Sequence, residues 1–281
     1  MSGLTYPEVE KAIYNKRGQM LIRDKKSDQL LHRFILGATV LAVLSLITIE
    51  IQWLKLLSRT DEFFLVLLRL IATSLTPHAW LELPTLWVPL FESLSVTVLA
   101  TFYSAIIGLF IGALAAPNIN QNRWLTMGIH MFFTFLRAVP TPVWVLLYLA
   151  SLGFGPAAGI MGLGIHATAF FVRMFSQSFE EVPREVIETL EAAGANRLQI
   201  FFGAIMPAAL SSLVAWFALR LEINFEQSSI LGMVGAGGIG YVIVAALHNG
   251  NEGLATLAIL LVFTCSLSLE LLFVRIKKKI M

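Results

Sequence analysis

The chain has 281 residues, of which 57% are hydrophobic and only 14% are charged, and its formal net charge is +2. Soluble domains carry about 25% charged residues, so this composition argues against a soluble protein and indicates a polytopic membrane protein. A single cysteine, Cys265, excludes a disulfide within the chain and a cysteine-built metal site, and no metal site is expected.

The N-terminal region is polar and basic. Residues 1–33 contain seven Lys or Arg residues. This region is too long to be the basic start of an ordinary cleavable signal peptide. The apolar segment 34–57 follows and is long enough to span a bilayer, which needs roughly 20 helical residues. We therefore expect a cytoplasmic segment at 1–33, and at 34–90 a first transmembrane helix and an external loop, in which 62–75 lies at the outer surface.

The rest of the chain is dominated by apolar segments. Five further segments are apolar and long enough to span the membrane: 91–116, 126–152, 157–177, 201–223 and 254–274. The segment 227–248 is apolar but rich in glycine, and each glycine costs about 1 kcal/mol against alanine inside a helix, so we expect a broken or re-entrant piece there. The sequence thus predicts an all-α polytopic protein with about six transmembrane helices and a transmembrane core at 91–275.

Basic residues predict the orientation in the plasma (inner) membrane. Both ends of the chain are basic, and residues 276–281 form a basic tail. An even number of spans places both termini on one side, which is then the cytoplasm. The loops 117–125 and 178–200 fall on the same side.

The predicted inner loop leads into a polar, helix-prone stretch, "ETLEAAGANRLQIFFGAIMP". Pro183 suits the first turn of a helix, and Gly194 is placed to end that helix in the left-handed conformation. Asn196 and Gln199 form the pattern of a capping box that starts a second helix. The pattern predicts a rigid helix–turn–helix that would convert a push from a partner into a helix tilt. A well-capped loop without a partner explains the same pattern.

The same stretch resembles the signature loop of ABC-importer permeases. In that family a glycine lies thirteen residues before a proline, as Gly194 and Pro207 do here, and a glutamate lies six residues before the glycine, which selects Glu188. The resemblance implies a type I ABC importer permease fold with cytoplasmic coupling helices and a loop that docks on an ATPase subunit. The coupling-loop residues that it implies are Glu188, Gly194, Ala195, Asn196, Ile205 and Pro207.

Three longer segments resemble the phosphonate-uptake permeases in particular: 136–156, 152–182 and 220–240, which reads "RLEINFEQSSILGMVGAGGIG". Thr141 stands where that family often has an acidic residue, so phosphonate, phosphite, hypophosphite and another small oxyanion stay open as substrates. Methionine and glycine-betaine permeases are the near neighbours. The resemblance implies a homodimer, two ATPase subunits that hold ATP and Mg, and an external oxyanion-binding protein. The permease itself is then not an enzyme.

Ionisable residues in spanning segments are costly and need a partner or a pathway. The guanidinium of Arg137 suits a tetrahedral oxyanion, but a carboxylate on another helix is an open alternative. His166 fits a packed, hydrogen-bonded histidine better than a ligand contact, and Arg173 fits a side chain that reaches for the interface. A structural network is the alternative for the polar cluster after Arg220. The candidate translocation-pathway residues are Arg137, Thr141, His166, Arg220, Glu222, Asn224, Glu226 and Ser228.

The motif "GAGGIG" matches the pattern of dinucleotide-binding loops, but no soluble parallel sheet has room around it. Its glycines are expected to pack closely against a helix or to let a gate bend. They are Gly235, Gly237, Gly238 and Gly240. The chain has no G-x-x-x-x-G-K-[ST] loop, so we expect no cofactor on it and no nucleic-acid partner.

Two other classes are weighed against the importer. An ion-coupled secondary carrier predicts inverted repeats and paired broken helices, whereas the sequence shows one glycine-broken segment. A membrane enzyme predicts a cluster of His, Asp or Glu with ligand spacing, or a Ser-His-Asp constellation, and neither stands out.

Overall fold

The computed structural model describes residues 25–48, 55 and 58–280. Most of the predicted basic segment 1–33 and the end of the predicted first span lie outside the described residues. The chain divides into two compact units, 1–65 and 66–281. The described part of the first unit contains α2 (Lys25–Thr48), of which Gln29–Thr48 is long and apolar enough to cross a membrane, and the first residues of α4 (Thr60–Ser74).

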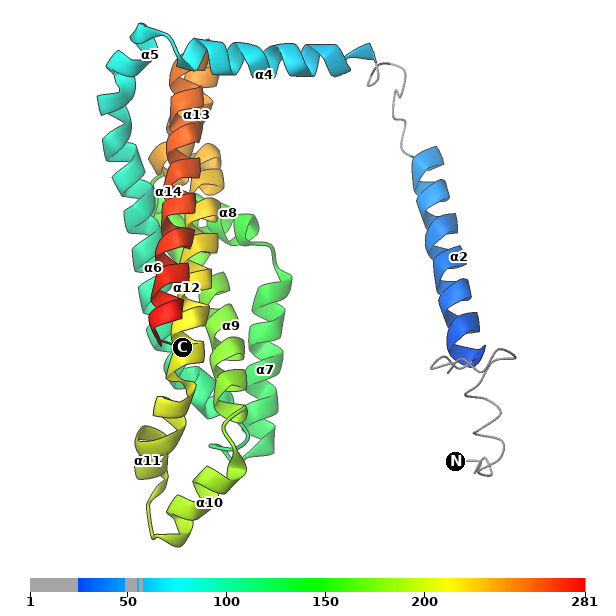
Figure 1. Ribbon diagram of the computed structural model, residues 1–281, viewed down its shortest axis with the longest axis vertical. Helices are drawn as coiled ribbons and strands as arrows, with labels where there is room; N and C mark the ends of the chain where they lie inside the picture. Colours follow the sequence, from blue (N-terminus) through cyan, green and yellow to red (C-terminus); the bar gives the residue numbers. More distant parts are fainter. Residues whose placement is uncertain (1–24, 49–54, 56–57, 281) are drawn as a thin grey trace. The chain divides into compact units, whose positions relative to one another are not determined.

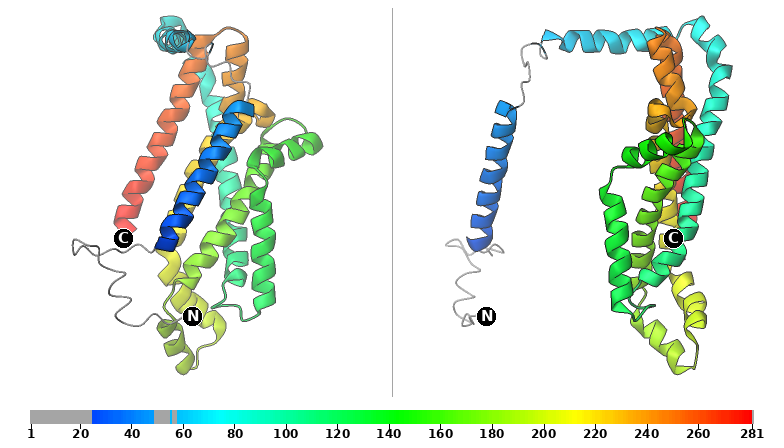
Figure 2. Two further views of the ribbon diagram at one scale, coloured as in Figure 1. Left: turned by 90° about the vertical axis from the view of Figure 1, so that its right-hand side faces the viewer. Right: turned by 180° about the vertical axis from the view of Figure 1, so that it is seen from behind.

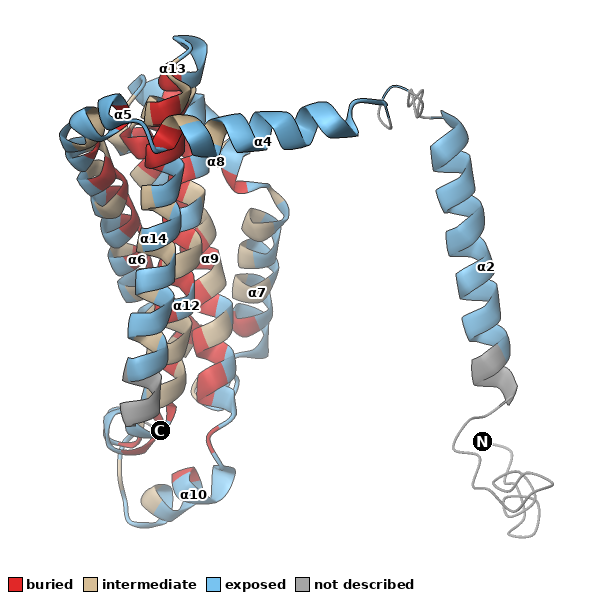
Figure 3. Cartoon of the chain, turned by 45° about the horizontal axis from the view of Figure 1, so that its top comes forward, coloured by how far each residue is buried: buried red, intermediate tan, exposed pale blue. Residues whose placement is uncertain are grey.

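The second unit is a bundle of long helices (Figure 1). They are α6 (Trp87–Ala115), α9 (Pro156–Glu180), α12 (Met206–Leu231) and α14 (Glu252–Ile280). The helix α9 is the centre of the bundle, since 61% of its apolar window is buried, against 11% for α14 (Figure 3). The backbones of α6 and α9 approach closely because Gly108 and Gly112 lie directly against Phe171 and Phe175.

The predicted continuous span 126–152 is wrong in one respect. It consists of α7 (Arg123–Ala138) and α8 (Thr141–Leu152), whose axes differ by 81°. Pro140 lacks an N–H group and disfavours a helical conformation in Val139, which is extended with ψ 122°. Among the described residues five helices can cross a membrane, or six if this bent pair counts as one span.

The predicted span 201–223 is also corrected, because α12 continues to Leu231. A π-helical turn, η3 (Gly232–Ala236), follows and is broken at Gly235, and the short α13 (Gly238–His248) comes next. The expected glycine-rich break is therefore confirmed.

The remaining elements lie at the two ends of the second unit (Figure 2). One end holds α13 together with α5 (Pro77–Glu82) and the 3-10 helix η1 (Leu83–Leu86). The other end holds α10 (Arg184–Ala192), α11 (Arg197–Ile200) and the π-helix η2 (Phe201–Ile205). The predicted all-α membrane architecture is confirmed.

Candidate functional site

The segment between α9 and α12 forms two short helices joined by a tight turn. Gly194 follows α10 with φ +84°, a conformation that glycine adopts without a steric penalty. Its N–H donates to the Glu191 carbonyl over 2.9 Å, and the Ala195 N–H donates to the Leu190 carbonyl over 3.0 Å. These bonds satisfy carbonyl groups at the end of α10, so the turn has a fixed geometry.

The second helix starts with a reciprocal cap. The Gln199 N–H donates to the Asn196 side chain over 2.9 Å, and the Asn196 N–H donates to the Gln199 side chain over 2.8 Å. The helix α11 then passes through η2 into α12 with helical backbone angles at both junctions. The capped helix–turn–helix predicted from the sequence is therefore confirmed as a local structure, and it is continuous with a spanning helix.

Both short helices are also held to the bundle by apolar contacts. Ile187 of α10 and Ile200 of α11 are buried in the same apolar cluster as Phe179 of α9 and Ile205 of η2. Because protein interiors are close-packed, a displacement of this helix pair must be transmitted to α9 and α12.

The outer face of the helix pair is exposed and mixed in character. The Glu188 side chain is 59% exposed and pairs with Arg184 across 2.9 Å. Leu198 and Phe202 are 70% and 65% exposed. The exposed side chains of this helix pair thus include a carboxylate and two large apolar groups.

Four of the candidate pathway residues lie inside the bundle. Arg220 is 3% exposed, and its guanidinium donates to His166 Nδ1 over 3.1 Å and lies 5.4 Å from the centre of the Phe170 ring. This contact supports the structural interpretation of His166. The Asn224 side chain donates to Thr101 Oγ1 over 2.8 Å.

The same face of α12 continues to Ser228. The hydroxyl of Thr97 donates to Ser228 Oγ over 3.2 Å. These bonds form a polar seam of α12 with α6 and α9. In it, Arg220 Nε and Asn224 Oδ1 are buried without a hydrogen-bond partner.

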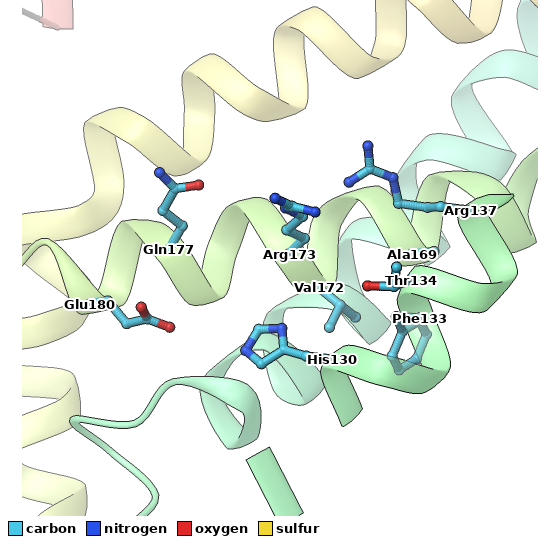
Figure 4. A pocket seen from close by; sticks show the side chains of 9 residues that line it. All are labelled: His130, Phe133, Thr134, Arg137, Ala169, Val172, Arg173, Gln177 and Glu180. Atoms are coloured by element: carbon cyan, nitrogen blue, oxygen red, sulfur yellow. The ribbon is translucent and has the colours of Figure 1, made fainter. Parts of the chain in front are cut away.

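Arg137 takes no part in the hydrogen bonds of this seam and lines a cavity of about 460 Å³ between α7 and α9 (Figure 4). The cavity is lined by His130, Phe133, Thr134, Arg137, Ala169, Val172, Arg173, Gln177 and Glu180. Arg137 Nη1 is buried and has no hydrogen-bond partner. Among the described residues no carboxylate forms an ion pair with Arg137 or Arg220.

Glu222 and Glu226 line a different cavity, of about 500 Å³, which also contains Glu270. Its other walls come from α12, α13 and α14 and are mostly apolar. Residues two apart on a helix point in different directions, and Arg220 and Glu222 accordingly face different surroundings. The structure therefore separates the predicted pathway residues into the polar seam, the Arg137 cavity and this acidic cavity.

Thr141 is buried at the start of α8, next to the bend. No cluster of His, Cys, Asp and Glu suited to a metal ion is present in the part of the chain that the structure describes.

The glycine-rich break is held by contacts that sequence reasoning missed. The Gly238 N–H donates to a carboxylate oxygen of Glu92 over 2.9 Å, and the Ile239 N–H donates to Ser93 Oγ over 3.0 Å. Gly235, Gly237 and Gly238 all have positive φ. The position of Glu92 in an apolar segment was an available signal, because a carboxylate there needs a partner.

Comparisons with known proteins agree with this geometry. The family described as "Binding-protein-dependent transport system inner membrane component" matches residues 108–281. An inward-facing structure of the MetNI methionine ABC transporter superimposes with a TM-score of 0.64 and 25% identity, covering 73% of this chain and 99% of that one. The predicted resemblance to ABC-importer permeases is confirmed.

Two curated relatives refine the comparison. The chain is 29% identical over 163 residues to the phosphite transport system permease protein PtxC of Stutzerimonas stutzeri, covering 58% of this chain and 59% of the relative. It is 27% identical over 179 residues to the phosphate-import permease protein PhnE of Mycolicibacterium smegmatis, covering 64% of this chain and 34% of the relative. The matches thus span about a third to three fifths of these relatives. With more than half of its length matched by one family, the chain belongs to the inner-membrane components of binding-protein-dependent transport systems.

Proposed function

We propose that this multi-pass inner-membrane protein is the permease subunit of an ATP-driven importer for phosphite, phosphonate or a related phosphorus oxyanion. The main structural support is the capped helix pair α10–α11, which is continuous with α12 and packed against α9. The relatives named for phosphite and phosphate transport support the class of substrate. The methionine transporter that shares the fold favours a second candidate, a permease for methionine.

In this function the helix pair is the contact for an ATPase subunit on the cytoplasmic side. The coupling residues are the predicted ones, from Glu188 to Pro207, with Ile205 buried where η2 meets α12. The assembly has two copies of this chain, two ATPase subunits that hold ATP and Mg, and an external binding protein. Both termini are cytoplasmic. The permease moves the solute and catalyses no reaction itself.

The mechanism follows from the connections of the helix pair. Closure of the ATPase subunits moves α10 and α11, and their shared apolar cluster with α9 carries the movement into the bundle. The bend at Pro140 and the break at Gly235 are the places where spanning segments change direction. Rigid helices that meet at such breaks reorient as bodies rather than deform along their length.

The first prediction tests the coupling surface with Glu188→Lys. A reversed charge at a partner interface costs about 2 kcal/mol or more, so we expect ATP-dependent phosphite uptake to fall more than about tenfold. The measurement is uptake and ATP hydrolysis by the reconstituted complex in vesicles. Folding is expected to stay intact, because Glu188 is exposed and makes only a surface ion pair.

The matched control is Glu191→Lys, the same change only three residues before Gly194, whereas the glutamate of the family's loop lies six residues before its glycine. We expect this variant to retain coupled uptake. Full uptake by Glu188→Lys together with loss in Glu191→Lys would show that the assigned register of the loop is wrong. Uptake that depends on an ion gradient and not on ATP would instead support a secondary carrier. Inhibition of phosphite uptake by methionine would support the second candidate.

A further inference from the structure

Two arginines line one cavity between α7 and α9, the half-buried Arg137 and the exposed Arg173. Arg137 comes from the last turn of α7 and Arg173 from the last third of α9, and Figure 4 shows their guanidinium groups on the same side of α9. Arg173 was expected only to reach for the membrane interface. Its place beside Arg137 assigns it a second role.

The charge around this cavity is not balanced by the chain. The one carboxylate among its lining residues is Glu180, which accepts a hydrogen bond from the Ser176 hydroxyl over 3.0 Å. Arg137 has one buried nitrogen without a partner, and its charge also repels that of Arg220. A charged nitrogen buried without a partner is costly, so an anion that reaches Arg137 Nη1 in the cavity is stabilised there.

The lining suits a small oxyanion in shape and chemistry. Guanidinium groups donate paired hydrogen bonds to tetrahedral phosphorus oxyanions, and the side chains of Thr134 and Gln177 offer further polar contacts. His130 Nε2 already bonds the Ala115 carbonyl over 3.1 Å. Glu180 lies at the end of α9 from which α10 departs, where its negative charge opposes tight retention of an anion. A transport pathway needs such weak binding, because the solute must leave again.

We propose that the α7–α9 cavity binds the transported oxyanion on its way through the membrane, with Arg137 and Arg173 as its ligands. This inference rests on the proposed function and names a site for its substrate. The acidic cavity that contains Glu222 and Glu226 repels the same ion and lies outside its path.

The test measures binding of phosphite to the complete permease–ATPase complex without ATP and without the binding protein, by ³¹P NMR titration. Arg137→Gln is expected to weaken binding at least about tenfold, the effect of losing charge-assisted hydrogen bonds, and Arg173→Gln severalfold. Arg137→Lys keeps the positive charge but loses the paired N–H groups of the guanidinium, so an intermediate affinity for phosphite is expected. The matched control is Arg123→Gln, at the start of α7 and outside the cavity, which should bind like the unaltered protein.

The outcomes separate the site from the function. Unaltered phosphite binding in both Arg137→Gln and Arg173→Gln overturns the site, while ATP-driven uptake by the unaltered complex leaves the proposed function standing. If Arg137→Gln fails to assemble, the exposed Arg173 and the Arg137→Lys variant carry the test. An unaltered complex that takes up no phosphorus oxyanion refutes the proposed substrate instead.

A phospholipid headgroup offers the same phosphate chemistry, so the titration is repeated in two environments. Phosphite binding is expected both in delipidated detergent and in nanodiscs that contain phosphatidylglycerol. Binding that survives only in the delipidated sample overturns the proposal and assigns the cavity to a headgroup.

Discussion

The two ends of α12 are built by different physical means. At one end the chain reaches α12 through a left-handed turn at Gly194, a capping box and a π-helical turn, all made within residues 194–205. At the other end α12 stops at a glycine break, and the next helix is capped by Glu92 and Ser93, which are 146 residues away in sequence from the N–H groups they accept. One end is therefore held by local interactions and the other by contacts between distant segments.

This difference suits the two tasks of the helix. A locally capped segment keeps its shape when a partner pushes on it, because its hydrogen bonds do not depend on the rest of the bundle. A break capped from a distant helix holds only while α6 and α13 stay together, so movement of either helix changes the break. Substitutions at each end measure the two kinds of support separately.

The largest effect is expected for Gly240→Ala at the break. A Cβ there would lie 1.8 Å from the Ser229 carbonyl oxygen, a backbone atom that cannot move without shifting α12. Overpacking of this kind costs about 3 kcal/mol or more, so the thermal midpoint of the purified protein should fall sharply. The measurement is a thermal unfolding curve in detergent.

Gly203→Ala is the matched control at the other end. It makes the same change inside η2, where a Cβ would meet nothing within 4 Å. Replacing glycine by alanine in a helix stabilises by up to about 1 kcal/mol, so its midpoint should stay or rise. Equal destabilisation by the two variants would contradict the close approach at Gly240.

An intermediate effect is expected for Glu92→Ala. The change removes the charged acceptor of the buried Gly238 N–H, which costs about 1.5–3 kcal/mol. Glu92→Gln keeps an acceptor oxygen and should lose less. Hydrogen exchange of the first turn of α13 checks the mechanism, because its amides should exchange faster in Glu92→Ala while those of α11 stay unchanged. Uniform acceleration across the protein would indicate general destabilisation instead.

The same contrast explains what the sequence predicted. The all-α architecture with about six spans, the turn at Gly194 and the Asn196 cap follow from rules that act within a few residues, and the structure confirms them. The end of α12 was placed eight residues early, because the charges after Arg220 looked like a helix end. Inside the helix, Arg220 donates to His166 and Asn224 donates to Thr101, while Glu222 and Glu226 line the acidic cavity with Glu270.

The candidate site was less predictable than the fold. Arg137 and Arg173 were both visible as ionisable residues in apolar segments, but only the packing of α7 on α9 shows that they line one cavity. The 81° bend at Pro140 was not predicted. Prolines are common in transmembrane helices, and neighbouring segments often satisfy the backbone groups that they leave free, so a proline alone does not indicate a break. The charge of Glu92 in an apolar segment indicated that it needs a partner, but a single sequence carries no signal for which distant residue that partner is.

The smallest effect is expected for Asn196→Ala at the local end. The variant loses the side-chain acceptor of the Gln199 N–H, and an N-cap of this kind contributes about 1 kcal/mol. Because the bond is local, we expect faster hydrogen exchange in α11 alone, with a nearly unchanged thermal midpoint. Asn196→Asp retains the acceptor and serves as the control. A large fall in the midpoint of Asn196→Ala would mean that the cap supports the whole bundle, and the distinction between the two ends of α12 would then fail.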